Sequence, residues 1–218
     1  MPIALECGLD LSQVVWESGS SPAGAATILD DQLSSSTRNV FLGSDLSGSW
    51  SRHEITEIFS DAPLRTEFKT LLDVGGGASD LEAVEVVNFV RNIYANPAAL
   101  SLSPSPQNPP RPAAYFPLGD IYHSQPVVVS PPNNYLYFTN YGLGPAHDYL
   151  SFQEKHAKRR RVVLVGANDG QLHAFDAGFW DRDDGGTYDD RHDLGTGTEL
   201  FAWVPEAVTN RLHRMTYG

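Results

Sequence analysis

A proline-rich stretch between Pro97 and Pro112 sets the strongest limit on how this chain can fold. Six of its sixteen residues are proline, and serine, asparagine and glutamine stand between them. Proline lacks a backbone N–H and fixes φ, so this stretch continues neither a helix nor a central strand and is expected to form an extended linker. The sequence therefore predicts a first region at residues 1–96, a linker at 97–114 and a second region at 115–218.

The first region combines helical and short extended patterns. Ser79-Asp80-Leu81-Glu82 has the form of a capping box, in which the two end residues satisfy each other's backbone N–H groups. The apolar residues after it recur at helical spacing and form one face: Ala83, Val86, Val87, Val90, Ile93 and Tyr94. Asn96-Pro97 ends this helix, because the residue before proline disfavours the α conformation. A shorter helix is predicted from Pro63 to Leu72, so the region is a small α+β unit.

The second region turns to β patterns. Val162–Val165 and Leu172–Phe175 flank Asn168-Asp169-Gly170, and this turn sequence accepts the positive φ that a hairpin requires. The remaining β-rich runs are Val127–Val129, Tyr135–Phe138 and Leu200–Val204. Short strands separated by turn signals predict a mainly β fold, here a partial β-propeller of about one blade. We expect too few strands to close a propeller, and hence a marginally stable chain with an open strand edge.

The charge balance excludes several classes of partner. The formal net charge is −12, which repels phosphate backbones, so we expect no nucleic acid. The basic cluster from Lys155 to Arg161 is interpreted as a solvated helix end that leads into a strand. The sequence contains no run of about 20 apolar residues of the kind that could span a membrane. The N-terminus lacks a signal-peptide pattern, so an export signal is expected upstream.

The candidate catalytic residues are weak. Asp120, His123 and Ser124 are the residue types of a hydrolase triad, but neighbours in a strand point to opposite faces. We interpret them as hydrogen-bonding groups at a strand edge. The seven histidines show no zinc-ligand spacing, and His173 is interpreted as a packed side chain. The single cysteine, Cys7, forms no disulfide within the chain. We therefore expect no enzyme activity.

An aspartate-rich insert is the best candidate for a metal site. It runs from Asp181 to Asp193 and carries six aspartates in thirteen residues, and Ca²⁺ prefers carboxylate and carbonyl oxygens. The EF-hand template fails, because Gly185 stands at its fifth position and His192 replaces the bidentate glutamate. A solvated surface loop and a weak Ca²⁺ site both stay open. The ligands of such a site would be Asp181, Asp183, Asp184, Asp189, Asp190 and Asp193.

Several segments resemble the PilY-type family of type IV pilus biogenesis proteins. Leu118–Val128 is similar to the segment that opens the family's propeller. Val165–Ala177 is similar to its most recognisable blade motif, and Gly197–Pro205 to the strand that follows. Trp16–Gly19 and Arg38–Phe41 are weaker matches upstream. The order and approximate spacing of these segments also agree with the family.

The resemblance implies a large quinoprotein-like propeller, a role in type IV pilus assembly and in opposing retraction, and adhesion at the pilus tip. The implied partners are a pilin or minor pilins and a host or abiotic surface, and the implied location is extracellular and pilus-associated. The family also implies Ca²⁺ regulation through an aspartate-rich loop in a later blade. We expect that loop to lie beyond Gly218, so none of its ligands is assigned here.

The sequence thus predicts a fragment of a pilus assembly and adhesion protein that serves as a non-catalytic propeller scaffold. Two alternatives stay open. Gly166-Ala167-Asn168-Asp169-Gly170 alone would also suit a quinoprotein dehydrogenase, although one cysteine cannot supply the vicinal pair that such enzymes often carry. The second alternative is a structural repeat scaffold, such as a propeller of outer-membrane assembly.

Overall fold

The computed structural model of the chain describes residues 24–35, 38–44, 51–72, 80–91, 118–133, 149–180 and 190–216. Its strands are β1 (Val40–Ser44), β2 (Ser51–Glu54), β3 (Val127–Val129), β4 (Arg161–Gly166), β5 (Leu172–Gly178) and β6 (Glu199–Pro205). Its helices are α2 (Ala25–Ser35), α3 (Glu57–Ser60), α4 (Ala62–Leu71), α5 (Asp80–Val90), α7 (Tyr149–His156) and α8 (Glu206–Thr216).

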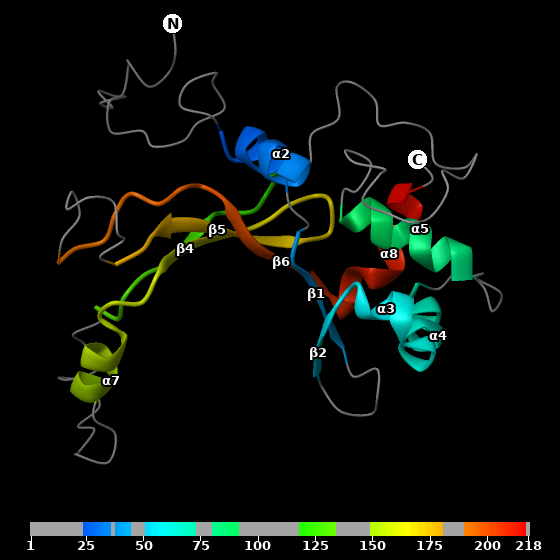
Figure 1. The fold of residues 1–218 in the computed structure, drawn as a ribbon, viewed down its shortest axis with the longest axis horizontal. Coiled ribbons are helices and arrows are strands. Elements are labelled where there is room, and N and C mark those ends of the chain that lie inside the picture. The colour runs from blue at the N-terminus through cyan, green and yellow to red at the C-terminus, as the bar shows by residue number, and fades with distance from the viewer. Residues whose placement is uncertain are drawn as a thin grey trace, which may run out of the picture.

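The six strands form one open, mixed sheet in the order β2-β1-β6-β5-β4-β3 (Figure 1). The predicted mainly β class is confirmed. The sheet does not close on itself, which is consistent with part of a propeller. The predicted hairpin is also confirmed, because β4 and β5 pair antiparallel with Val165 opposite His173. Gly170 adopts a φ of 79° at the turn, as the Asp-Gly pair requires.

A parallel pair joins the two halves of the sequence. β1 lies parallel to β6, with Val40 opposite Ala202 and Leu42 opposite Val204, and β2 extends the sheet by antiparallel pairing with β1. The sequence patterns did not predict β1 or its pairing, since no local signal links residues this far apart. The linker at 97–114 lies outside the described residues, so the division into domains stays a prediction.

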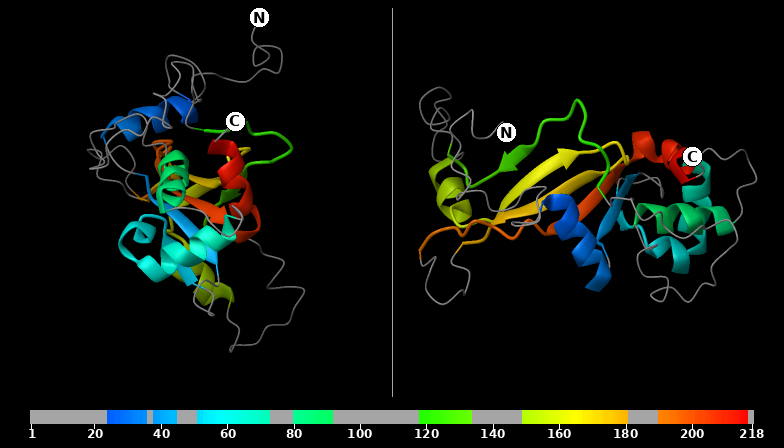
Figure 2. Two further views of the ribbon diagram at one scale, coloured as in Figure 1. Left: turned by 90° about the vertical axis from the view of Figure 1, so that its right-hand side faces the viewer. Right: turned by 90° about the horizontal axis from the view of Figure 1, so that it is seen from above.

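The apolar core lies where helices cover one end of this sheet. The predicted helices are present as α4 and α5: Asp61 caps α4 by accepting a bond from the N–H of Leu64 at 2.9 Å. Ser79, Ile93 and Tyr94 lie outside the described residues. The core brings together strand and helix residues, namely Val40, Leu42, Ile55, Ile58, Leu64, Phe68, Leu72, Ala83, Val86, Val87, Val90, Ala202, Val204 and Leu212. Figure 2 shows these helices gathered at one end of the sheet.

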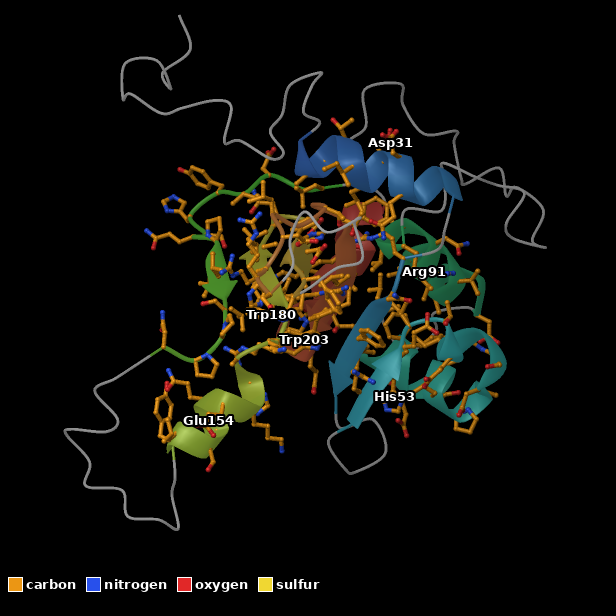
Figure 3. All side chains as sticks on the ribbon, turned by 60° about the vertical axis from the view of Figure 1, so that its left-hand side comes forward. Asp31, His53, Arg91, Glu154, Trp180 and Trp203 are labelled. Atoms are coloured by element: carbon orange, nitrogen blue, oxygen red, sulfur yellow. The ribbon has the colours of Figure 1, made fainter. Side chains whose placement is uncertain are left out.

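The other end of the sheet is different. β3 forms the edge and pairs with β4. α7 precedes β4, so the basic cluster is a helix end leading into a strand, as predicted. It is not solvated throughout, because Arg159 donates to the carbonyl of Ser130 and Arg160 lies 3.4 Å from the buried Asp176. Figure 3 shows α7, marked by Glu154, standing apart from the helices near His53 and Arg91. The predicted strand Tyr135–Phe138 lies outside the described residues. Among the described helices, none is long and apolar enough to cross a membrane.

Candidate functional site

A cluster of ionisable side chains lies inside the fold, and we call it the ionic cluster. Arg38 lies two residues before β1, Glu199 begins β6, His173 lies in β5 and Asp169 lies in the β4–β5 turn. Because β5 pairs with β6 and β6 pairs with β1, the sheet order brings these separate segments together. Arg38 and Glu199 are almost fully buried, and the side chain of His173 has no exposed surface.

Arg38 is the cation at the centre of this cluster. Its Nε and Nη2 atoms donate to the two carboxylate oxygens of Glu199 at 2.6 and 2.7 Å. Its Nη1 donates to the carbonyl of Val90 at 2.9 Å, and Nη2 also lies 3.0 Å from Oε1 of Gln171. The planar guanidinium suits this bidentate arrangement. Arg38 thus ties the start of β1 to β6, to the end of α5 and to the start of β5.

His173 bonds to a carboxylate at each ring nitrogen. Nδ1 lies 2.7 Å from Oε1 of Glu199, and Nε2 lies 2.9 Å from Oδ2 of Asp169. An ionised carboxylate only accepts hydrogen bonds, so both bonds exist together when both nitrogens carry protons. Burial alone would lower the pKa of His173, but the bonds to Asp169 and Glu199 outweigh it and raise the pKa. The ring therefore favours the charged form.

The charges of the cluster balance. Burial acts to raise the pKa of Glu199, but the hydrogen bonds from His173 and Arg38 outweigh burial and lower that pKa. With His173 protonated, the cluster holds two cations and two carboxylates and is neutral as a whole. Neutrality stabilises the fold, because removing one partner of a buried ion pair leaves an uncompensated charge and costs about 3–5 kcal/mol.

Asp169 connects the ionic cluster to a second segment. Besides His173, its Oδ2 accepts from the N–H of Gly119 at 3.1 Å, and its Oδ1 accepts from the N–H of Gln171 at 3.0 Å. The N–H of Asn168 donates to the carbonyl of Asp120 at 3.0 Å. A Cβ atom at Gly119 would lie 2.6 Å from the backbone nitrogen of Asp169, so this close approach requires glycine. The hairpin turn is thereby fastened to residues 118–120.

The arrangement suits structural bonding better than acid–base chemistry. His173 and Glu199 already bond to protein groups, and their side chains are at most 1% exposed. A cleft of about 650 Å³ opens elsewhere on the molecule. It is lined by Thr70, Leu71, Trp203, Pro205, Glu206, Ala207 and Asn210, and it contains no member of the ionic cluster. The bonds of the cluster join the segments that carry it across the sheet.

The residues of the triad type do not assemble. Oγ of Ser124 accepts from the N–H of Gly166 at 3.2 Å, and Asp120 contributes its backbone carbonyl to the hairpin turn. His123 is exposed, has a φ of 59° and places its ring against Tyr122. Ser124 thus forms a hydrogen bond to the end of β4, in line with the predicted hydrogen bonding at a strand edge. The described hydrogen bonds join none of the three side chains to another.

The aspartate-rich insert is described only at its C-terminal end, residues 190–193. Asp181, Asp183, Asp184 and Asp189 lie outside the described residues. Asp193 closes the base of the insert, because its Oδ1 accepts from the N–H groups of Phe179 at 2.7 Å and Gly195 at 2.9 Å. Asp190 is exposed. Within the described ranges, no three His, Cys, Asp or Glu residues are grouped so that they could hold a metal. The Ca²⁺ site therefore stays a prediction.

The sheet edge at β3 is apolar and open. Val127 is 57% exposed and Val128 is 58% exposed. Successive residues of a strand point to opposite faces, so both faces of β3 are uncovered by the described residues. Ile121 and Tyr122, just before this strand, are also exposed. We call Ile121, Tyr122, Val127 and Val128 the apolar edge.

Sequence reasoning placed His173 in a strand as a packed side chain but missed its partners. Arg38 and Glu199 each lie at or just before the start of an apolar strand, and a charged residue at such a position is ordinarily predicted to be exposed to solvent. A signal did exist, because a histidine inside an apolar strand needs a polar partner once it is buried. The identity of that partner depends on which strands pair, and local patterns do not reveal the pairing.

Comparison with known proteins gives relatives over part of the chain. A type IV pilus biogenesis factor PilY1 homolog from Xylella fastidiosa is 42% identical over 99 residues, or 45% of this chain and 7% of the relative. A type IV pilus biogenesis factor PilY1 from Pseudomonas aeruginosa is 36% identical over 99 residues, with the same coverage. The matched part thus spans a small fraction of these relatives. No family model matches the chain, and no solved structure does.

Proposed function

On the premise that the chain is a PilY-type protein of type IV pilus biogenesis, we propose that it serves as a non-catalytic scaffold in pilus assembly and adhesion. The observation that carries this proposal is the sequence identity to the PilY1 proteins. The open sheet adds physical support, because an incomplete sheet with a bare edge is suited to packing against further protein. The proposed location is extracellular, at the pilus or cell surface.

The buried chemistry supports a scaffold rather than an enzyme. A general base must reach a substrate proton, yet the side chain of His173 has no exposed surface and bonds on both sides to protein carboxylates. Glu199 is held by Arg38. These bonds fix strands relative to one another. They join β1, β6 and β5, which are neighbours in the sheet.

The apolar edge supports a role in binding other proteins. Exposed valines on a short edge strand offer unpaired backbone groups and apolar area, the two features that strand addition uses. We propose that a pilin or minor pilin, or an adhesion surface, is contacted by this side of the molecule. The helical end is less suited, because its apolar residues are already buried in the core.

The test is genetic and uses the full gene in its own bacterium. Deletion should remove most surface pili, counted by electron microscopy, and should abolish adhesion. Restoration with the unaltered gene should recover both. Restoration with Val127→Lys plus Val128→Lys should give normal protein levels but fewer pili or weaker adhesion. A matched control, Thr66→Lys on an exposed site of α4, should restore fully. Normal piliation in the deletion strain would refute the role in biogenesis.

The non-catalytic part of the proposal has its own test. Reconstitution of the purified chain with pyrroloquinoline quinone should give no dye-linked oxidation of alcohols, and a quinoprotein dehydrogenase assayed alongside should be active. Activity that follows added cofactor would favour the dehydrogenase alternative over the scaffold. The expected result follows from the buried state of the ionisable side chains described above.

A further inference from the structure

The ionic cluster contains one group whose charge can change near neutral pH. His173 ordinarily titrates near 6.5, and its ring bonds to the two carboxylates of the cluster, one of which also pairs with Arg38. Loss of the His173 proton would leave the cluster with one cation and two carboxylates. It would also turn one ring nitrogen into an acceptor that faces a carboxylate oxygen. Only the protonated ring of His173 can therefore donate to both Glu199 and Asp169.

We propose that His173 is a proton-operated latch, which holds residues 118–120 against the β4–β5 turn when charged and releases them when neutral. The inference concerns the fold of this chain and does not depend on the proposed function. It rests on the chain of bonds from Glu199 through His173 to Asp169, and from Asp169 to the N–H of Gly119.

The bond that opens is the one between His173 and Asp169. Glu199 keeps its two bonds from Arg38 whatever the state of the ring, and its side chain is only 1% exposed. A proton on Nε2 alone would leave a bare Nδ1 2.7 Å from an oxygen of the buried Glu199, which cannot turn away, and Nη2 of Arg38 is farther from Nδ1, at 3.4 Å. In the proposed neutral state the remaining ring proton therefore stays on Nδ1, facing Glu199. Asp169 has a 14% exposed side chain and can turn toward water. When it turns away from Nε2, its Oδ2 also leaves the N–H of Gly119, so the latch opens at residues 118–120.

The charged groups around the ring support this sequence of events. From the segment before β1, Nη2 of Arg38 lies 3.4 Å from Nδ1. β6 contributes Glu199, and the β4–β5 turn contributes Asp169. Behind Arg38, α5 is followed by Arg91, which interacts with Arg38 and with Glu54 of β2. On β4, the residue opposite His173 is Val165, which carries no charge. One cation, Arg38, thus lies beside the ring, and two carboxylates contact the ring directly.

The direction of the pH effect follows from the sign of the shift. The pKa of His173 is raised in the folded chain by its carboxylate partners, against the effect of burial. A raised pKa means that the folded, latched state binds the proton more tightly than the released state. The stabilisation is complete below the ordinary pKa and disappears as pH rises through the raised one. The latch is therefore closed in mildly acidic solution and opens toward alkaline pH.

Release would act on the apolar edge. Residues 118–124 carry Ile121 and Tyr122 and lead into β3. Besides Asp169, the segment is held by the bond from Asn168 to the carbonyl of Asp120 and by Ser124, which accepts from Gly166. Loss of the Asp169 bonds loosens its first residues and leaves the Ser124 contact in place. The expected opening is local and does not unfold the sheet.

The decisive experiment is a titration of the unaltered chain by NMR. The ring signals of His173 give its pKa directly, and amide exchange gives a protection factor for Gly119 at each pH. Each unit by which that pKa exceeds the value in the released state changes the opening equilibrium about tenfold. We expect the protection factor of Gly119 to fall by that factor between the acidic and alkaline plateaus, with a midpoint at the measured pKa. The Gly166 amide, bonded to Ser124, should keep its protection.

Two variants separate the latch from general pH effects. Asp169→Asn retains an oxygen acceptor for Gly119 but removes the charge, so the pKa of His173 should fall and the pH dependence of Gly119 should shrink. His53→Gln is the matched control, because His53 also contacts a carboxylate, Glu57 at 3.3 Å, but on the surface. It should leave the Gly119 profile unchanged. A His173 pKa at or below the ordinary value, or a Gly119 protection factor independent of pH, would overturn the proposal.

Discussion

The two ends of the sheet differ in whether helices cover them. At the β1–β2 end, helices from both halves of the sequence cover the strands, and Phe68, Leu42 and Leu212 have no exposed surface. At the β3 end, Val128 is exposed on an edge strand, and α7 has no buried residue. Figure 1 shows α7 and the α3–α5 helices at opposite ends of the molecule. The same sheet thus has one end with a core and one end open to solvent.

The difference shows where the stability of the chain resides. Burial of apolar area contributes about 25 cal/mol per Å², so the β1–β2 end supplies most of the hydrophobic stabilisation. The ionic cluster lies between the ends and joins them through Arg38 and His173. The β3 end contributes exposed area, which favours contact with another surface. Substitutions at the β1–β2 end should therefore mainly lower the free energy of unfolding. Substitutions at the β3 end should mainly change association with other chains.

The largest effect is expected at the helical end. Phe68→Ala removes a fully buried ring of α4 from the core, and truncation of a buried phenylalanine costs about 3–5 kcal/mol. Phe152→Ala in α7 makes the same chemical change at a ring that is 46% exposed, and we expect a cost of about 1 kcal/mol or less. Urea denaturation of both variants measures the two costs. Equal losses would show that the β3 end packs as well as the helical end.

The next effect tests the junction between the ends. Arg38→Ala leaves Glu199 buried without its guanidinium partner, and breaking one side of a buried ion pair costs about 3–5 kcal/mol. Arg52→Ala is the matched control, because Arg52 is exposed and stacks over the ring of Phe41. Its loss should cost about 1 kcal/mol or less. The measurement is again the free energy of unfolding, read at a pH where His173 is charged. A small loss at Arg38 would mean that the cluster contributes little to joining the two ends.

The helical end and the open end also differ in what the sequence could predict. Local patterns identified α4, α5 and the β4–β5 hairpin, because caps, 3.6-residue spacing and Asp-Gly turns act between near neighbours. The parallel pairing of β1 with β6 was not predicted, because it joins residues far apart in the sequence, such as Val40 and Ala202. The ionic cluster escaped for the same reason. An open strand edge was anticipated from the number of strands, without its place at β3. Of the helices that cover the other end, α4 and α5 were predicted, whereas α3 and α8 were not.

A smaller effect is expected on association at the open end. The isolated chain should unfold at or below about 65 °C, as ordinary mesophilic domains do, and should form larger particles as its concentration rises. Val128→Lys places a charge on the edge strand and should weaken this association, since charged edge residues oppose strand pairing. Thr66→Lys adds the same charge to an exposed site of α4 and should not. Light scattering joined to thermal melts measures both. A monomer that stays cooperative and stable well above that temperature would contradict an open edge.

The smallest effect concerns Ca²⁺ at the aspartate-rich insert. Asp193 already accepts two backbone N–H groups through Oδ1, which leaves it less capacity for a metal. The template's bidentate glutamate is replaced by His192, whose Nε2 contacts the carbonyl of Arg159 at 2.8 Å. We therefore expect weak binding, with a Kd on the order of 10⁻⁴–10⁻³ M, typical of low-affinity sites that are occupied only where Ca²⁺ is abundant. Calorimetry of the chain measures it.

Variants within the insert decide whether that weak binding arises there. Asp183→Ala and Asp189→Ala should each reduce the heat of binding, because each removes a carboxylate that a hard cation prefers. Asp80→Ala is the control, since Asp80 is an exposed carboxylate on α5 that already pairs with Lys69 and Arg65. Unchanged binding in both insert variants would place the ions elsewhere, and sub-micromolar binding would require ligands beyond these aspartates. Loss of binding in the insert variants alone would place the Ca²⁺ site within the insert, apart from both the packed core and the apolar edge.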